Sequence, residues 1–177
     1  MFCRPGFIFF RQELSKSDLN YLEIGVFNGD SIAELAKLNP NKMIYGIDPF
    51  IEDGCTMHTT HVKENESMPV QRQNTYNNIS GLNNIKLFEM KSKDFDNTQD
   101  LNIGWILIDG SHHYEDVCID IKIAMKQIGN KKGGIVFDDT NYAPVIQAHN
   151  EFLIEYKDRI TNTVDLYNGA IMAHFIN

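Results

Sequence analysis

The sequence has few of the features that mark secreted or membrane-spanning proteins. Its cysteines number only three, at irregular spacing: Cys3, Cys55 and Cys118. So sparse and odd a set does not suit a disulfide-stabilised domain and favours a reducing compartment, so we expect a cytoplasmic protein. No apolar run approaches the roughly 20 residues that cross a bilayer. The run Phe7–Phe10 is too short for a signal peptide, and we interpret it as packing surface, with homo-oligomer contact as one possibility.

Basic residues are also scarce. Lysine and arginine total 16 against 24 aspartates and glutamates, which gives a formal net charge of -8. This balance argues against nucleic acid or an anionic membrane as a partner, because both attract basic surfaces. The length of 177 residues suits one domain, 1–177. Within it we expect a short N-terminal cap at 1–20 and a variable, partly mobile segment at 51–81.

Short apolar runs alternate with helical patterns along most of the chain. Helical spacing of apolar residues follows the first run, at Ser31–Leu38, and recurs between Val117 and Ile128 and after Pro144. Strands that alternate with helices predict a parallel sheet with helices on both faces. The expected strands are Tyr21–Val26, Met43–Ile47, Ile85–Met90, Trp105–Ile108 and Ile135–Phe137.

The end of the chain departs from this alternation. Two apolar-rich stretches, Thr163–Tyr167 and Ala170–Phe175, flank Asn168-Gly169, which is a strong hairpin signal. We therefore predict an α/β fold with a doubly wound, mostly parallel sheet that ends in an antiparallel hairpin. The polar segment Ile51–Gly81 shows only a faint helical pattern, at Val70–Ile79, and its first half is expected to be a mobile loop.

Polar or flexible residues stand at the expected carboxyl ends of the strands. In open α/β sheets, ligands bind beyond these ends. One acidic residue there is often only a helix cap or a turn, but acids that follow several strands together indicate a site. The residues at these ends are Gly25, Asp48, Ser92, Asp109, Asp138 and Asp139.

The first loop, Glu23–Ser31, limits the ligand. Phe27 and Asp30 stand where a nicotinamide or flavin fingerprint would need glycines, and no Gly-Lys-Ser/Thr phosphate loop follows. Asp30 would also repel a pyrophosphate at the start of the next helix. Asp48, at the end of the second strand, is placed to bind a ribose diol. A nucleoside without pyrophosphate, carrying an amino-acid tail near the glycines, describes S-adenosylmethionine.

These motifs resemble a known family. The segment Glu23–Ser31 (EIGVFNGDS) is similar to the E-x-G-x-x-x-G-x-S motif of class I methyltransferases, as in catechol O-methyltransferase-like enzymes and in the macrocin O-methyltransferase and cephalosporin hydroxylase-like group. Ile108–Tyr114 and Gly133–Thr140 resemble the second half of the same group. The resemblance runs from about Tyr21 to the C-terminus and implies a Rossmann-like methyltransferase fold.

The resemblance implies a set of cofactor-binding residues for S-adenosylmethionine. Gly25 and Gly29 match the glycines beside its methionine moiety. Glu23 matches the acid that supports the loop and reaches the amino group. Asp48 matches the acid that binds the ribose. Ser92 matches a serine near the adenine ring.

The resemblance also implies metal ligands. Asp109, Asp138 and Asp139 match the acids that bind metal in the metal-dependent members, and such oxygen ligands suit Mg²⁺ or another hard divalent cation. Alternatively, Asp109 binds the cofactor, Asp138 caps a helix and Asp139 is solvated. Catechol-type enzymes have asparagine where this chain has Asp139.

His112, three residues after Asp109, matches the general base proposed for the macrocin-like group, so His112 and Asp109 are the expected catalytic residues. Histidine suits that task because its reference pKa of about 6.5 lies near working pH. His113 is expected to be a helix-start residue. The spacing Cys55-x-x-His58-x-x-His61 lacks the fourth ligand of a structural zinc site. His149 and His174 are expected to be structural.

The sequence thus predicts O-methylation of a hydroxyl on a sugar or another small molecule, with a divalent metal and a histidine base. Two alternatives stay open. One is a metal-independent methyltransferase that acts on nitrogen or on a protein side chain, and the other is a non-catalytic module that binds S-adenosylmethionine. Iron oxygenase chemistry, the label of one branch of the group, is not persuasive, because the motifs lack the spacing of two histidines and one carboxylate.

Overall fold

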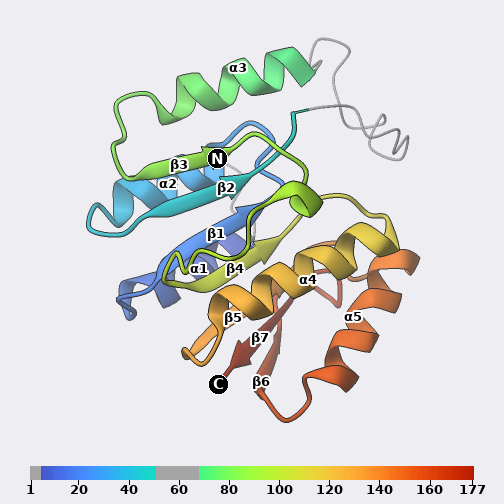
Figure 1. Cartoon of the computed structure of the whole chain (residues 1–177). Coiled ribbons are helices and arrows are strands. Elements are labelled where there is room, and N and C mark those ends of the chain that lie inside the picture. The colour runs from blue at the N-terminus through green and yellow to red at the C-terminus, as the bar shows by residue number, and fades with distance from the viewer. Residues whose placement is uncertain (1–4, 51–67) are drawn as a thin grey trace.

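A seven-stranded sheet forms the centre of the computed structural model, which describes residues 5–50 and 68–177 (Figure 1). The strand order is β3-β2-β1-β4-β5-β7-β6. The first five strands along the chain pair in parallel, and β7 pairs antiparallel with both β5 and β6. The strands are β1 (Asn20–Ile24), β2 (Ile44–Ile47), β3 (Ile85–Phe88), β4 (Ile103–Ile108), β5 (Gly133–Phe137), β6 (Ile160–Asp165) and β7 (Met172–Ile176).

Helices cover both faces of this sheet. One apolar cluster joins α4 and α5 to the strands, and a second joins α1 and α2 to the opposite face, with Ile79 of α3 packed against it. Figure 1 shows α4 and α5 in front of the sheet and α1 and α2 behind it. The predicted doubly wound fold is therefore confirmed. The helices are α1 (Pro5–Ser15), α2 (Asp30–Leu38), α3 (Met68–Ile79), α4 (Tyr114–Ile128) and α5 (Ala143–Glu155), with the short 3-10 helix η2 (Ser92–Asp94).

The central strands are buried on both faces, which explains their near-continuous apolar sequence. Every residue of β5 is buried, and so is every residue of β4 except Leu107. The chain runs outward from β1 through β2 to β3, and then returns to β4 on the other side of β1. Such a reversal of strand order opens a crevice at the carboxyl ends of the two central strands. The loops after β1 and β4 therefore flank the expected binding position.

The predicted C-terminal hairpin is confirmed, and its turn lies where the sequence places it. Asn168 and Gly169 both have positive φ, at 47° and 77°. Two positive φ values in succession are what a type I′ turn requires. Backbone hydrogen bonds from Ala170 to Tyr167 and from Leu166 to Ile171 continue the pairing up to the turn. The hairpin adds two strands beyond β5.

Two helices were not clearly predicted. The N-terminal cap contains α1, and Phe10 is fully buried there, with its ring centroid 4.7 Å from that of Tyr21. The Phe7–Phe10 run thus packs in part within the chain and is not wholly a free interface. The faint pattern at Val70–Ile79 corresponds to the regular helix α3. The expected mobile loop and the Cys55, His58 and His61 pattern lie outside the described residues, apart from the end of that segment.

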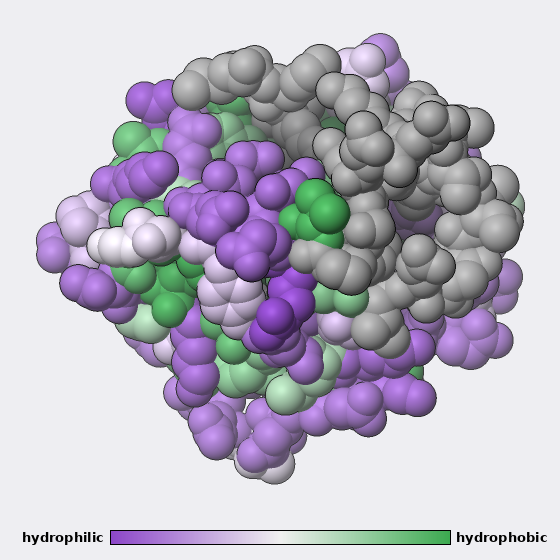
Figure 2. All heavy atoms as spheres, turned by 90° about the horizontal axis from the view of Figure 1, so that it is seen from above, coloured by the Kyte–Doolittle hydropathy of each residue, from purple (hydrophilic) through white to green (hydrophobic). Residues whose placement is uncertain are grey.

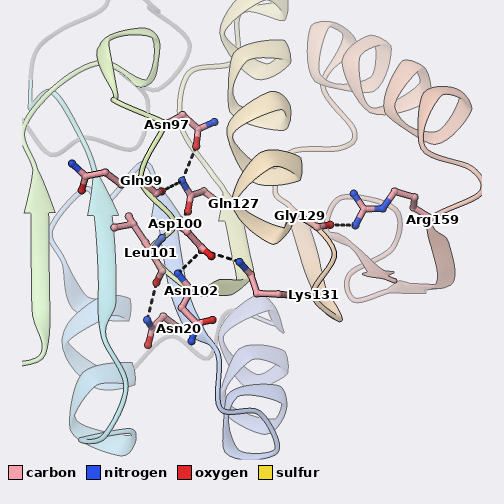
Figure 3. Close-up of polar contacts among 10 residues, drawn as sticks. All are labelled: Asn20, Asn97, Gln99, Asp100, Leu101, Asn102, Gln127, Gly129, Lys131 and Arg159. Atoms are coloured by element: carbon pink, nitrogen blue, oxygen red, sulfur yellow. Dashed lines mark hydrogen bonds and ion pairs between the residues drawn. The ribbon is translucent and has the colours of Figure 1, made fainter.

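Polar contacts connect the loops at the amino edge of the sheet (Figure 3). The amide of buried Gln127 on α4 donates to the Asn97 side chain at 2.7 Å and to the Gln99 carbonyl at 2.9 Å. Lys131 pairs with Asp100 at 2.9 Å. These contacts fix the segment between η2 and β4 against α4.

Among the described residues, no helix combines the length and apolarity needed to cross a bilayer. On the face that carries α3, the described residues are mostly hydrophilic, and the hydrophobic ones among them form small separate patches (Figure 2).

Candidate functional site

Gly25 brings the loops after β1 and β4 into direct contact. Its φ of +91° is unfavourable for any residue with a side chain, and a Cβ placed on it would lie 1.9 Å from the carbonyl oxygen of Asp109. The Asp109 amide also donates to the carbonyl of Ile24 at 2.9 Å. The structure thus brings together two residues that the sequence analysis assigned to one site.

Glu23 is a buried carboxylate on β1, only 2% exposed. Hydroxyl groups of Tyr21 and Ser31 both donate to it, and the Tyr21 contact measures 2.7 Å. Burial raises the pKa of Tyr21 well above its usual range, and the charges of Glu23 and Asp109 raise it further. Because Ser31 belongs to α2, Glu23 ties β1 to the helix that follows the first loop, which agrees with the supporting role expected for it.

The carboxylate of Asp48 organises the backbone around it. Its Oδ2 accepts the amides of Val26 at 2.8 Å and Phe27 at 3.0 Å, and its Oδ1 accepts the amide of Phe50 at 2.7 Å. Asp48 therefore joins the end of β2 to the first loop. Ribose binding by Asp48 stays a prediction.

Helix α3 holds the first loop from the outside, a contact that the sequence analysis missed. The Thr75 hydroxyl donates to the Phe27 carbonyl at 2.7 Å, and the Asn78 amide donates to the Asn28 carbonyl at 2.9 Å. A Cβ on Gly29, whose φ is +75°, would lie 2.8 Å from Thr75 Cγ2. The contact face of α3 is polar, which explains why its apolar periodicity is weak.

His112 and Asp139 form an ion-pair contact across the site. His112 Nε2 lies 2.7 Å from Asp139 Oδ2, and the histidine side chain is 10% exposed. The ring of Tyr142 meets the His112 ring edge-on at 5.6 Å. Asp139 has a φ of 55°, and its amide donates to Asp138 Oδ1 at 2.8 Å. Left-handed backbone is uncommon for a residue other than glycine and is often found at functional sites.

The predicted magnesium ligands do not form a metal site in this arrangement. Within residues 5–50 and 68–177, no group of three or more histidine, cysteine, aspartate or glutamate side chains is placed to hold a metal ion. Asp139 faces His112, and Asp138 accepts the amide next to it. The donor set as placed does not fit a cation at Asp109, Asp138 and Asp139, and the metal prediction gains no support from it.

Ser92, the residue expected near adenine, begins η2 and faces a buried acid on α4. Asp120 is 1% exposed, and its pKa is raised to about 7, mainly by burial and also by Asp116, although a hydrogen bond with Ser92 lowers it. The sequence analysis did not single out Asp120. It stands one position before Ile121 and three after Val117, on the apolar stripe of the helix, and an acid on such a stripe is a detectable signal.

The other histidines that the structure describes lie where the sequence analysis expected them. His113 is exposed and directly precedes α4. His149 of α5 and His174 of β7 are buried, with their Nε2 atoms 2.7 Å apart, and Thr163 Oγ1 lies 2.9 Å from His174 Nδ1. Burial lowers the pKa of both rings to about 4. They form a neutral structural pair between α5 and the hairpin.

Solved structures share this fold. The chain is similar to the O-methyltransferase NovP, with a TM-score of 0.68 and 13% identity over 98% of this chain and 79% of that one. It is also similar to a caffeoyl-CoA O-methyltransferase-like protein from Staphylococcus aureus, with a TM-score of 0.65 and 17% identity over 100% of this chain and 85% of that one. At such identities the likeness establishes the fold.

A curated relative shares more of the sequence. The uncharacterized protein R132 of Acanthamoeba polyphaga mimivirus is 34% identical over 129 residues, which are 70% of this chain and 52% of that protein. The chain thus spans about half the length of this relative.

The family model described as a methyltransferase domain matches residues 22–140, a range that contains every predicted site residue. The chain therefore belongs to the methyltransferase domain family, and its predicted place among the class I S-adenosylmethionine-dependent methyltransferases is confirmed.

Proposed function

We propose that this domain transfers a methyl group from S-adenosylmethionine to a hydroxyl oxygen of a small molecule. The observation that carries the proposal is the His112–Asp139 pair, with its 2.7 Å contact, at the carboxyl edge of the sheet. A histidine held by a carboxylate is a suitable base for a hydroxyl proton. The chain spans half of its curated relative, so the proposal concerns this domain and its reaction.

The residues around the crevice suit the proposed cofactor. Gly25 lies where the loops after β1 and β4 meet, and Gly29 ends the first loop against Thr75 of α3. The methionine moiety would lie beside this loop. Glu23 supports this loop, Asp48 would bind the ribose, and Ser92 and Asp109 would flank the adenosine. When bound, S-adenosylmethionine supplies an electrophilic methyl carbon on a sulfonium, and the chain must align an acceptor oxygen with it.

Asp139 would set the protonation of His112. A carboxylate that accepts from Nε2–H favours the tautomer with its proton on Nε2, which places the basic lone pair on Nδ1. His112 would take the hydroxyl proton as the oxygen–carbon bond forms and the carbon–sulfur bond breaks. The Tyr142 ring, edge-on to the imidazole, would restrict its rotation. Asp139 would then stabilise the imidazolium.

A sugar or another small hydroxyl compound is the acceptor class that we propose. The two solved structures compared above, which share this fold, are both described as O-methyltransferases. The net charge of -8 does not favour a polyanionic acceptor. Assembly into a homo-oligomer and a cytoplasmic location stay predictions.

The steps above need no metal. Magnesium assistance through Asp109, Asp138 and Asp139 stays a separate prediction, and rearrangement of the Asp139 side chain away from His112 would be required for it. Turnover measured after treatment with EDTA, and again after addition of Mg²⁺, tests it directly. A rate that depends on Mg²⁺ would support the metal, whereas an unchanged rate would favour the metal-free path.

The test of the proposed function has a binding arm and a turnover arm. We expect S-adenosylhomocysteine to bind in isothermal titration calorimetry, and S-adenosylmethionine to yield a methylated product, seen by mass spectrometry, with members of a sugar and phenol panel. His112→Ala should lower turnover about 100-fold or more, as the loss of a general base does. It should leave the affinity for S-adenosylhomocysteine nearly unchanged.

His113→Ala is the matched control, because it removes the adjacent, exposed imidazole. Equal losses in the two variants would overturn the role of His112. Binding of S-adenosylhomocysteine without turnover on any acceptor would favour a non-catalytic binding module. Product formed on amines or on protein side chains alone would favour the alternative acceptor class.

A further inference from the structure

Asp120 is a buried acid that takes no part in the proposed methyl transfer. It lies on the face of α4 that packs on the sheet and on η2, with 1% of its surface exposed. Burial of a carboxyl group is costly unless its oxygens find hydrogen-bond donors. Within the described residues, Oδ1 of Asp120 is buried and has no hydrogen-bond partner. An unsatisfied buried polar group of this kind calls for an explanation.

Asp120 lies against two elements of the expected cofactor site, η2 and the end of β4. From η2, Ser92 provides a side-chain hydrogen bond. From the end of β4, the backbone of Gly110 approaches so closely that a Cβ on it would lie 3.4 Å from Asp120 Oδ2. Asp120 therefore lies next to both Ser92, the serine expected at the adenine ring, and the loop that begins at Asp109.

A second polar residue of α4 shows what a purely structural contact looks like in this molecule. Gln127, two turns later on α4, contacts the segment between η2 and β4 at the end that is farther from Asp120 (Figure 3). It donates to Asn97 and Gln99 and accepts the Leu101 amide at 3.3 Å. Both the nitrogen and the oxygen of its side-chain amide therefore have hydrogen-bond partners. Asp120 is left with unused bonding capacity at the end of the segment nearest the site.

We propose that Asp120 is a positioning residue of the cofactor site, which holds Ser92 of η2 and the Gly110 backbone of β4 in register for the adenosine half of S-adenosylmethionine. This inference rests on the proposed function. Because Oδ1 is buried, Asp120 acts through Ser92 and Gly110 and does not itself touch the cofactor. The neutral carboxyl is the form that suits this place, since Asp116, one turn earlier on α4, adds a repulsive charge.

The test compares affinities for S-adenosylhomocysteine, measured by calorimetry on the full chain. Asp120→Ala and Ser92→Ala should each weaken binding about tenfold, the scale of one lost hydrogen bond. The double variant should bind no more weakly than either single variant, because both remove the same contact. Asp120→Asn, which keeps a neutral group of the same shape, should restore most of the affinity.

A pH series separates positioning from general stability. Asp116 is the charged neighbour that acts on Asp120, whereas η2 presents Ser92 and β4 presents backbone. The affinity of the wild-type protein should fall as the pH rises from about 6 to 8.5, because Asp120 becomes charged near its pKa of about 7. The Asp120→Asn protein should bind equally well at both ends of this range.

Gln127→Leu is the structural control. It should lower the Tm and leave the affinity within about twofold, since its contacts lie at the amino edge of the sheet. If Asp120→Ala does not fold, the affinities of Ser92→Ala and Asp120→Asn and the pH series still test the role of Asp120. Unchanged affinities and a flat wild-type pH profile would overturn the inference alone. Failure of the wild-type protein to bind S-adenosylhomocysteine would overturn the proposed cofactor and the inference together.

Discussion

Three of the described residues other than glycine have left-handed backbone conformations in the loops that directly follow β1, β2 and β5. These are Phe27, Phe50 and Asp139, with φ of 54°, 47° and 55°. Such a conformation costs on the order of 1 kcal/mol per residue. In each case a strand-end carboxylate accepts the amide of the strained residue, Asp48 for the two phenylalanines and Asp138 for Asp139. These carboxylates stabilise backbone shapes that the site requires.

Gly25 provides a prediction at this scale, because Gly81 is a matched control. Gly81 has a similar φ of +78°, but a Cβ placed on it meets nothing within 4 Å. Gly81→Ala should therefore cost only the backbone strain, about 1 kcal/mol. Gly25→Ala should cost about 1–3 kcal/mol more, because its Cβ would overlap the Asp109 carbonyl. Urea denaturation measures both, and equal losses would show that the close approach of the two loops is unimportant.

At the scale of elements, α3 acts as an outer support for the first loop. Asn78 donates both to the Asn28 carbonyl and to Asp30 Oδ1, at 2.9 and 3.0 Å. These bonds reach the loop at the point where it becomes α2. The loop is thus held by Asp48 from one side and by α3 from the other, and its shape does not depend on the cofactor alone.

We expect Asn78→Ala to weaken binding of S-adenosylhomocysteine about five- to tenfold and to lower stability by about 1 kcal/mol, because two hydrogen bonds to the loop are lost. Gln73→Ala is the control on the same helix, since the exposed Gln73 amide donates to Asn77 and not to the first loop. It should change neither quantity measurably. A loss of stability in Asn78→Ala without any loss of affinity would mean that α3 has no influence on the binding loop.

The contact between α5 and the hairpin predicts how stability depends on pH. The pKa of His149 and His174 is about 4 in the folded protein against 6.5 ordinarily, so between these values the unfolded chain binds more protons. Their contribution to stability is complete above about pH 6.5 and is lost as the pH falls toward 4. The free energy of unfolding should therefore decline over this interval.

His149→Phe isolates the effect of the pair. At pH 7.5 the variant should be about 1–3 kcal/mol less stable, because it leaves His174 without its partner. At pH 5 the deficit should shrink. The wild-type pair stays neutral in the folded protein at this pH, whereas both histidines bind protons in the unfolded chain, so the wild-type protein itself loses stability. Thermal unfolding at several pH values measures this difference, with His113→Ala as a control that should follow the wild-type protein. A deficit that is independent of pH would contradict the assignment.

At the scale of the whole molecule, the sheet was the most predictable part. Strands such as Trp105–Ile108 are buried on both faces, so they appear as apolar runs, and Asn168-Gly169 suits only a few backbone shapes. Helix α3 was hardly visible because the face that it buries against the first loop is polar. The pairing of His112 with Asp139 joins two loops 27 positions apart in the sequence, and local patterns contain no information about such contacts.

The sequence predicted many residues of the site, but it did not predict which of them contact one another. Gly25 and Asp109 were placed in one site, and the structure brings them together. Asp109, Asp138 and Asp139 were interpreted as ligands for a cation, whereas Asp138 accepts a backbone amide and Asp139 contacts His112. Charge alone could not distinguish these uses, because both require a carboxylate in the same position. Asp120 was passed over because it stands among apolar residues of α4.

Trp105 is the sole tryptophan of the sequence, and its place in the structure has an optical consequence. The indole lies among the edges of Phe9 and Phe175, near the amino end of β4, and its N–H has no hydrogen-bond partner among the described residues. In so dry a setting its fluorescence should be emitted at short wavelength and shift to the red on unfolding. Because the cofactor crevice lies at the opposite end of β4, ligand titrations should leave this emission unchanged. Folding and binding can then be observed in one sample through separate signals.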